Sequence, residues 1–145
     1  MSDLTFSVNG KGETEARTAV KVRNFKLIVD EPESLGGTNK DANPVEYILA
    51  GLAGCVNVVA NLTAQELGIK VKKLEINAAG NLNPRRLLGI DLQERAGYKN
   101  IDLKINAITD ASESKKSKWL KLIESRCPVS DNLKNPTQVS LGFLN

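Results

Sequence analysis

The chain contains two cysteines and no histidine, and these two facts limit the chemistry that it can perform. Without histidine, neither a Ser–His nor a Cys–His nucleophile can form, so acid–base work falls to carboxylates, arginine, lysine, tyrosine or thiols. Two cysteines alone are also too few ligands for a structural zinc site. We therefore expect no metal and no cofactor, and Cys55 and Cys127 become the residues of interest.

Two interpretations of these thiols are open. Both can be small buried residues, which is a common position for a free cysteine. Alternatively they form a redox pair, in which one thiol reacts and the other resolves the product. Cys127 precedes Pro128 at the end of a predicted helix, where the free N–H groups of a following turn would stabilise a thiolate. Cys55 lies inside a helix and would need a nearby arginine or lysine.

The element that must position Cys55 is an apolar helix over residues 43–68. Asn43 can cap its start, Glu46 is placed to complete a capping box with Asn43, and Gly68 is a natural stop. Nearly every residue between these ends is apolar or small, which is typical of a buried helix. Its glycines and alanines would also let a second backbone approach closely.

Strands and a second helix are predicted on both sides of this helix. A long loop, 31–42, precedes the central helix, and Ser112 is expected to cap the second helix. Alternating or apolar runs predict strands over 1–9, 16–23, 25–30, 71–80, 101–108 and 137–143, a helix over 113–126 and a short helical turn in 127–133. The fold class is therefore α+β with antiparallel strands, organised as a single domain over 1–145.

Composition excludes several other classes of protein. A net charge of +3 over 145 residues is too mild for a dedicated nucleic-acid-binding protein. No stretch reaches the roughly 18 apolar residues that a membrane span needs, and the first residues are too polar for a signal peptide. We therefore expect a cytoplasmic protein with neither a nucleic acid nor a membrane as partner.

Three motifs together resemble the OsmC/Ohr family, the osmotically inducible protein C and organic hydroperoxide resistance proteins. The motifs are Leu35-Gly36-Gly37, then Asn43-Pro44-Val45-Glu46 followed by Ala53-Gly54-Cys55, and finally Cys127-Pro128-Val129-Ser130. The order of predicted strands and helices also fits, so the resemblance extends over nearly the whole chain. Departures from the pattern of the hydroperoxide reductases, described below, place the chain in the broader OsmC-like group.

The resemblance implies an intertwined homodimer in which antiparallel sheets wrap around two central helices, one from each chain. It also implies thiol peroxidase chemistry without metal or haem. By analogy, Cys55 attacks an organic hydroperoxide and becomes a sulfenic acid, and Cys127 then forms a disulfide with it. An external dithiol, which is of the lipoyl type in the organic hydroperoxide members of the family, restores both thiols.

The sequence departs from the family pattern around the reactive thiol. Peroxidases of the family hold the thiolate with an arginine from the N-terminal strands and with a glutamate directly after Asn-Pro. Here Val45 occupies that position and Glu46 follows it, about 100° further around a helix. Glu46 is therefore either a site carboxylate or only a capping residue. Arg17 and Arg23 share strand parity in the N-terminal strands, and Arg17 lies nearer the expected place.

Three functions remain in competition. The leading hypothesis is a thiol-dependent peroxidase for organic hydroperoxides in oxidative stress defence, with Cys55, Cys127, Arg17 and Glu46 as its site. The second is an OsmC-like dimer without peroxidase activity that binds a small apolar ligand. The third is a thiol-based redox sensor with a protein partner.

Overall fold

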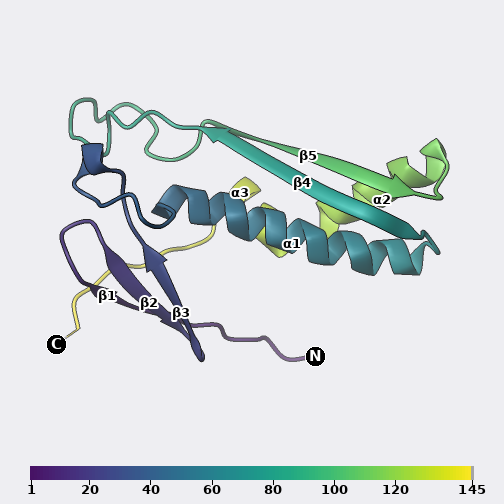
Figure 1. The fold of residues 1–145 in the computed structure, drawn as a ribbon, viewed down its shortest axis with the longest axis horizontal. Coiled ribbons are helices and arrows are strands. Elements are labelled where there is room, and N and C mark those ends of the chain that lie inside the picture. The colour runs from purple at the N-terminus through teal and green to yellow at the C-terminus, as the bar shows by residue number, and fades with distance from the viewer. Residues whose placement is uncertain (145) are drawn as a thin grey trace. The chain divides into compact units, whose positions relative to one another are not determined.

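The chain forms two compact units, seen in a computed structural model that describes residues 1–144. The first unit is Met1–Ile48, and the second begins at Leu49, inside the central helix. Each unit has its own antiparallel sheet, with strand order β1-β2-β3 in the first and β4-β5 in the second (Figure 1). Together with the helices α1 (Pro44–Glu66), α2 (Glu113–Arg126) and α3 (Pro128–Lys134), these sheets confirm the predicted α+β class.

The first unit is a small three-stranded sheet. Its strands are β1 (Asn9–Gly12), β2 (Thr18–Val22) and β3 (Phe25–Val29), and β2 pairs with both neighbours. The connection between β1 and β2 is tight because the backbone N–H groups of Glu13 and Thr14 both donate to the carbonyl of Arg17, at 2.8 and 3.2 Å.

Two strand predictions are wrong, and both concern the ends of the chain. Residues 1–8 have no regular secondary structure, and β1 begins only at Asn9 and extends to Gly12. Residues 136–144 also lack regular structure. Both segments alternate apolar with polar residues, but a strand forms only where a neighbouring strand completes its hydrogen bonds. Their large apolar side chains are exposed: Leu4, Phe6, Val8, Val139, Leu141 and Phe143.

The loop between β3 and α1 explains the Gly-Gly pair of the first motif. A short 3-10 turn, η1 (Glu33–Leu35), ends at Gly36, whose φ of +83° is a left-handed conformation that favours glycine. A Cβ on Gly37 would lie 1.7 Å from the backbone oxygen of Glu31, so no other residue fits there without moving the backbone. Gly36 therefore allows the left-handed backbone of this turn, and Gly37 allows the close approach of the Glu31 backbone.

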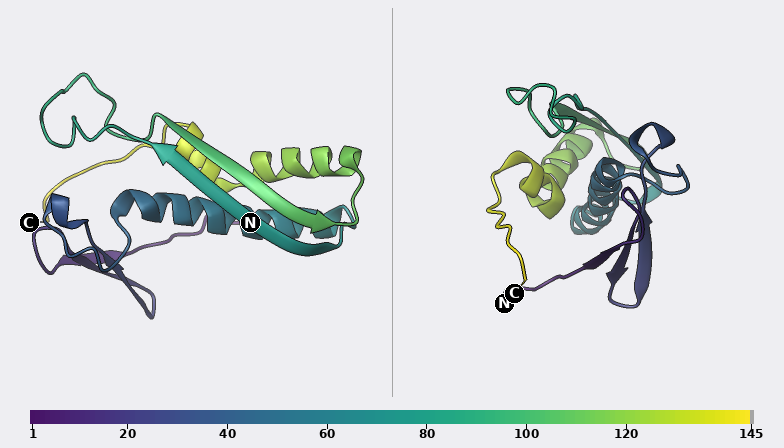
Figure 2. Two further views of the ribbon diagram at one scale, coloured as in Figure 1. Left: turned by 45° about the horizontal axis from the view of Figure 1, so that its top comes forward. Right: turned by 90° about the vertical axis from the view of Figure 1, so that its left-hand side faces the viewer.

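The second unit packs two helices on one side of a long hairpin (Figures 1 and 2). The hairpin strands are β4 (Val71–Asn81) and β5 (Asn100–Thr109), paired from Val71↔Thr109 to Asn81↔Asn100. The buried core joins both helices, and the Nε1–H of Trp119 on α2 donates to the carbonyl of Ala60 on α1 at 2.9 Å. The core side chains are Leu52, Val56, Val59, Ala60, Ala64, Ile69, Trp119, Ile123 and Cys127.

The central helix corrects one further expectation. By length and composition α1 is long and apolar enough to cross a membrane, with a mean hydropathy of 1.6 over its best window, of which 33% is buried. Length and composition do not separate such a helix from the core helix of a soluble protein. The prediction that no stretch of the chain is long and apolar enough to span a membrane was therefore wrong.

Candidate active site

The structure brings the two thiols together within the second unit. Cys55 lies in the middle of α1, and Cys127 lies at the break between α2 and α3. Their Sγ atoms are 3.2 Å apart, with Cys127 donating its S–H to Cys55. Both cysteines are free thiols. A disulfide bond is about 2.05 Å long, so a shift of about one ångström would join the two sulfurs.

The two thiols differ in their access to solvent. Cys127 is 2% exposed and belongs to the core, whereas Cys55 is half-buried. Pro128 has no N–H, so the donors nearest the sulfurs come from the next residues of α3. The backbone N–H of Ser130 donates to the Sγ of Cys127 at 3.4 Å. An external reagent can thus reach Cys55 and not Cys127.

The environment of Cys55 within its unit favours the neutral thiol. Burial raises the pKa of Cys55, and the adjacent Cys127 thiol raises it further, while a hydrogen bond from the backbone N–H of Val129 partly opposes this rise. Because the thiolate is the reactive species, efficient chemistry at neutral pH requires an additional cation near Cys55.

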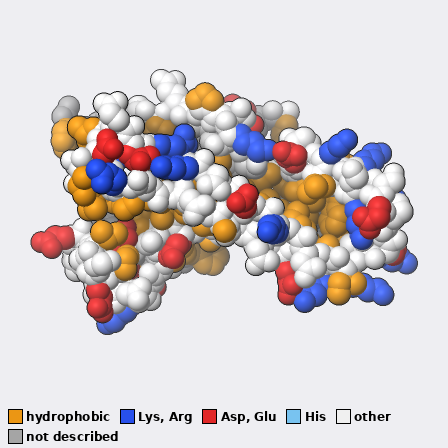
Figure 3. Space-filling model, turned by 90° about the horizontal axis from the view of Figure 1, so that it is seen from above, with side chains coloured by type: hydrophobic (Ala, Val, Ile, Leu, Met, Phe, Trp, Pro, Cys, Tyr) orange, Lys and Arg blue, Asp and Glu red, His pale blue; other side chains and the backbone are white. Residues whose placement is uncertain are grey.

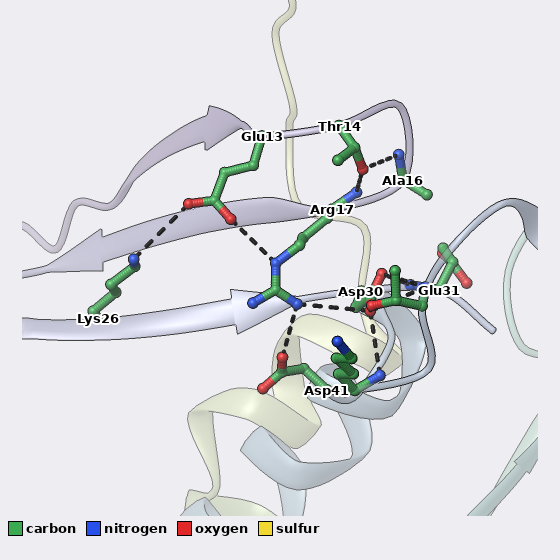
Figure 4. Close-up of polar contacts among 10 residues, drawn as sticks. Glu13, Thr14, Ala16, Arg17, Lys26, Asp30, Glu31 and Asp41 are labelled. Carbon is green, nitrogen blue, oxygen red and sulfur yellow. Dashed lines mark hydrogen bonds and ion pairs between the residues drawn. The ribbon is translucent and has the colours of Figure 1, made fainter. Parts of the chain in front are cut away.

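Arg17 lies in the first unit, surrounded by three carboxylates (Figure 4). Its Nε donates to Glu13 at 3.1 Å and its Nη1 donates to Asp41 at 3.1 Å, while Asp30 lies 3.7 Å from Nη1. Burial lowers the pKa of Arg17, but the hydrogen bonds and charges of Glu13 and Asp41 outweigh this effect and raise it overall. The guanidinium is therefore fixed in place and permanently charged.

Asp30 is the buried anchor of this cluster. Its side chain is completely buried, and its carboxylate accepts hydrogen bonds from the Thr38 hydroxyl at 2.5 Å and from the backbone N–H groups of Glu31, Thr38 and Lys40. The Thr38 hydroxyl is the main cause that lowers the pKa of Asp30 to about 2, against the opposing effect of burial. The carboxylate thus holds the loop before α1 in shape.

Glu46 acts as a helix cap. Its carboxylate accepts the backbone N–H of Asn43 at 2.9 Å, and the Asn43 side chain accepts the backbone N–H of Glu46 at 2.9 Å. These reciprocal bonds are a capping box. The sequence left capping and a site role open for Glu46, and the structure shows the capping bonds, while the site role stays a prediction.

The two arginines have different positions. The prediction that both lie in N-terminal strands with the same parity was wrong. Arg17 precedes β2, whereas Arg23 follows it, in the turn to β3, with a φ of +51°. Neither residue is in a strand, so strand parity does not apply. The Arg23 guanidinium lies 5.1 Å from the ring centre of Phe25, and this cation–π contact gives it a structural role.

Sequence reasoning missed Asp30, Asp41 and Glu13. Asp30 ends an apolar strand and is followed by a loop rich in glycine, threonine and asparagine, a setting in which a carboxylate commonly collects backbone N–H groups. The sequence therefore contained a signal that could have identified Asp30. It contained none for the pairing of Arg17 with Asp41 across the loop.

The second unit also contains a cavity of about 280 Å³ between β5 and α2. Its walls are mainly apolar, with one lysine and one asparagine at the edge, and it includes neither cysteine. The lining residues are Ile105, Asn106, Ala107, Lys116, Trp119, Leu120 and Ile123.

The fold and the thiol pair define an α+β protein with a dithiol centre between its core helix and the α2–α3 break. The model of the OsmC-like protein family matches residues 37–142, well over half of the chain, so the chain belongs to the OsmC-like family.

Relatives of this chain support the same assignment. The chain is 27% identical over 141 residues to a hydroperoxide reductase of Mycoplasma pneumoniae, covering 97% of this chain and 92% of that protein. Two solved structures share the fold. The OsmC-like protein of Mycoplasma pneumoniae has a TM-score of 0.81 at 21% identity, covering 93% of this chain and 91% of that one. An organic hydroperoxide resistance protein of Elizabethkingia anophelis has a TM-score of 0.67 at 20% identity, with the same coverage.

Proposed function

We propose that this protein is a thiol-dependent peroxidase that reduces organic hydroperoxides. The observation that carries the proposal is the 3.2 Å contact between a half-buried Cys55 thiol and a buried Cys127 thiol. A reactive thiol that a peroxide can reach, with a resolving thiol directly behind it, is the arrangement that a two-cysteine peroxidase requires. The name of the Mycoplasma pneumoniae relative, hydroperoxide reductase, agrees with this chemistry.

The proposed reaction has two steps on the protein. The Cys55 thiolate attacks one oxygen of the peroxide, the O–O bond breaks, and the leaving alkoxide takes up a proton to become an alcohol. Cys55 is then a sulfenic acid. The Cys127 sulfur attacks the Cys55 sulfur, the hydroxyl group leaves as water after taking up a proton, and the disulfide forms. An external dithiol, of the lipoyl type by analogy, reduces the disulfide by thiol–disulfide exchange.

Arg17 is proposed as the cation that stabilises the Cys55 thiolate. The raised pKa of Cys55 shows why the reaction needs such a group. Arg17 suits the role because Glu13 and Asp41 hold its Nε and Nη1, while Arg23 is engaged with Phe25. Glu46 is the less supported member of the proposed site, since its carboxylate caps α1.

We further propose that the working protein is a cytoplasmic homodimer in which both units of each chain belong to one OsmC-like domain. The family match crosses the boundary between the units. On α1, Gly51, Gly54, Val58 and Leu62 form an exposed stripe at helical spacing, and a Cβ on either glycine would meet nothing within 4 Å. Such a stripe suits close packing against a second α1.

The proposal is tested by steady-state consumption of cumene hydroperoxide with dihydrolipoamide as reductant. We expect activity in the natural protein and, because Cys55 supplies the nucleophile, a loss of about a thousandfold or more in Cys55→Ser. Arg17→Met should lower the rate about tenfold to a hundredfold, because the thiolate loses its cation. Unchanged consumption in Cys55→Ser would refute the proposal.

A second candidate function rests on the cavity beside α2. Its apolar walls and its volume of about 280 Å³ suit a small apolar ligand, close to the lower limit of known ligand pockets. Binding of a fluorescent apolar probe that is lost in Trp119→Ala, together with no consumption of peroxide, would favour this function over the peroxidase.

A further inference from the structure

The connection between β4 and β5 exposes an unusual number of large apolar side chains. Leu87, Leu88, Ile90 and Leu92 are 72%, 53%, 60% and 64% exposed. All four lie within one segment, Pro84–Arg95, which we call the leucine loop. Isolated exposed leucines are ordinary on a protein surface, but four in six residues form a patch that needs a partner.

The leucine loop is held in shape by its own hydrogen bonds. The backbone N–H of Leu88 donates to the carbonyl of Pro84, and that of Ile90 donates to the carbonyl of Arg85. The Arg86 side chain closes the loop by donating to the carbonyls of Leu92 and Glu94. The apolar side chains are therefore presented by an ordered turn, and little conformational entropy is lost when it binds a partner.

Basic residues flank the apolar residues of the leucine loop in the sequence. Between Leu82 and Lys99 there are four basic residues (Arg85, Arg86, Arg95 and Lys99) and two acidic ones (Asp91 and Glu94), which gives 4 − 2 = +2. Arg85 lies 3.9 Å from Asp91, and Lys99 lies 2.8 Å from Glu94, so Arg86 and Arg95 supply the excess charge. Figure 3 views the molecule from the side on which this connection lies in Figure 1, and hydrophobic side chains adjoin side chains of both charges on that face.

We propose that the leucine loop docks on an anionic lipid surface. Leucine and isoleucine side chains enter the boundary between headgroups and acyl chains, and flanking arginines attract anionic headgroups. A protein partner would find an apolar patch as well, but the net positive charge beside exposed aliphatic side chains favours lipid. The expectation of no membrane partner considered only segments that would span a membrane, and a peripheral contact needs no such segment. This inference does not depend on the thiol chemistry.

The test is flotation of the full-length protein with vesicles of phosphatidylcholine alone and of phosphatidylcholine with phosphatidylglycerol. We expect binding to the anionic vesicles only, reduced by salt and reduced about tenfold or more in Leu87→Gln/Ile90→Gln, which removes two inserted side chains. The matched control is Ile108→Gln/Leu133→Gln, two aliphatic side chains that are 53% and 39% exposed elsewhere in the second unit. It should bind as the natural protein does.

Two results would overturn the inference. One is equal flotation of the loop variant and the natural protein, or no flotation of either. The other is a change in molecular mass of the loop variant in light scattering, which would show that the loop contacts a second copy of the chain. Consumption of cumene hydroperoxide in solution, measured on the same samples, reports on the peroxidase separately, so the two proposals can fail independently.

Discussion

The two cysteines have different surroundings, and in the proposed reaction this difference gives them different tasks. Cys55 is accessible to an external reagent, whereas Cys127 is buried in the core behind it. A buried thiol in contact with an accessible one can reach only the product formed on its neighbour. In the proposed cycle, Cys127 therefore acts after Cys55 has become a sulfenic acid and the alcohol has left.

Replacing Cys127 separates the two steps. We expect Cys127→Ser to complete the first step and to stop at the Cys55 sulfenic acid, because no thiol resolves it. Mass spectrometry after treatment with one equivalent of cumene hydroperoxide and dimedone should show one adduct per chain, on Cys55. Turnover with dihydrolipoamide should fall about tenfold or more. An adduct on neither residue would contradict this order of events, and Cys55→Ser is the control.

Asp30 makes the stability of the first unit dependent on pH. Its pKa is about 2, below the ordinary 3.8, so the folded state favours the carboxylate. A lowered pKa contributes stability that is fully present above pH 3.8 and is lost as the pH falls from there through 2. We expect Asp30→Asn to lower the melting temperature by several degrees at pH 7, and the gap to the natural protein to narrow between pH 4 and 2.

Thr38→Val provides a sharper form of the same test. The Thr38 hydroxyl is the main cause of the lowered pKa of Asp30, so its removal should move the acid unfolding transition to higher pH. Asp3→Asn, at an exposed carboxylate, should leave the transition unchanged. An unchanged transition in Thr38→Val would show that Asp30 does not anchor the loop.

At the scale of elements, substitutions at the start of α1 distinguish whether Glu46 is a capping residue or a residue of the proposed site. Asn43→Ala removes the cap and should cost about 1 kcal/mol in the free energy of unfolding. Glutamine can replace glutamate in a capping box, so Glu46→Gln should keep both stability and turnover. Chemical denaturation and the peroxide assay measure the two effects. Lost turnover at unchanged stability in Glu46→Gln would instead support the site role that the resemblance implies.

Helices and strands that are marked by capping residues or by regular apolar spacing within their own sequence were predictable. The second helix lies at Glu113–Arg126 as predicted, with Ser112 accepting the backbone N–H of Lys115, because capping and apolar spacing are local properties. The hairpin strands were also predicted to within one residue at each end. The chain ends were not predicted correctly. Residues 1–9 and 137–143 have the alternating pattern of a strand, but the sequence of each segment does not determine which other strand would supply its hydrogen bonds. The same limit applies to the site, where the contact of Cys55 with Cys127 depends on packing between α1 and the α2–α3 break.

At the scale of the whole molecule, we expect a homodimer. The exposed stripe on α1 and the unpaired segments at both ends of the chain all present apolar side chains that a second copy could cover. Size-exclusion chromatography with light scattering should give twice the chain mass of 15.7 kDa.

A charge on the stripe should separate the two chains. Val58 is 56% exposed on α1, and Val58→Lys should lower the measured mass to that of one chain, because a lysine would be buried without a partner at the interface. Leu120→Lys, at a residue of similar exposure on α2, is the control and should remain dimeric. A natural protein of one chain mass, or a dimeric Val58→Lys, would contradict the proposed interface.

The central claim is that Cys55 and Cys127 act together as a peroxide-reducing pair, and counting thiols during a single turnover tests it most directly. The reduced protein is mixed with one equivalent of cumene hydroperoxide or hydrogen peroxide in a stopped-flow instrument, and free thiols are titrated before and after. We predict rapid loss of both thiols in each chain, faster with the organic peroxide, and full recovery with dihydrolipoamide. Retention of both thiols on the same timescale would contradict the account and leave the apolar cavity beside α2 as the better guide to function.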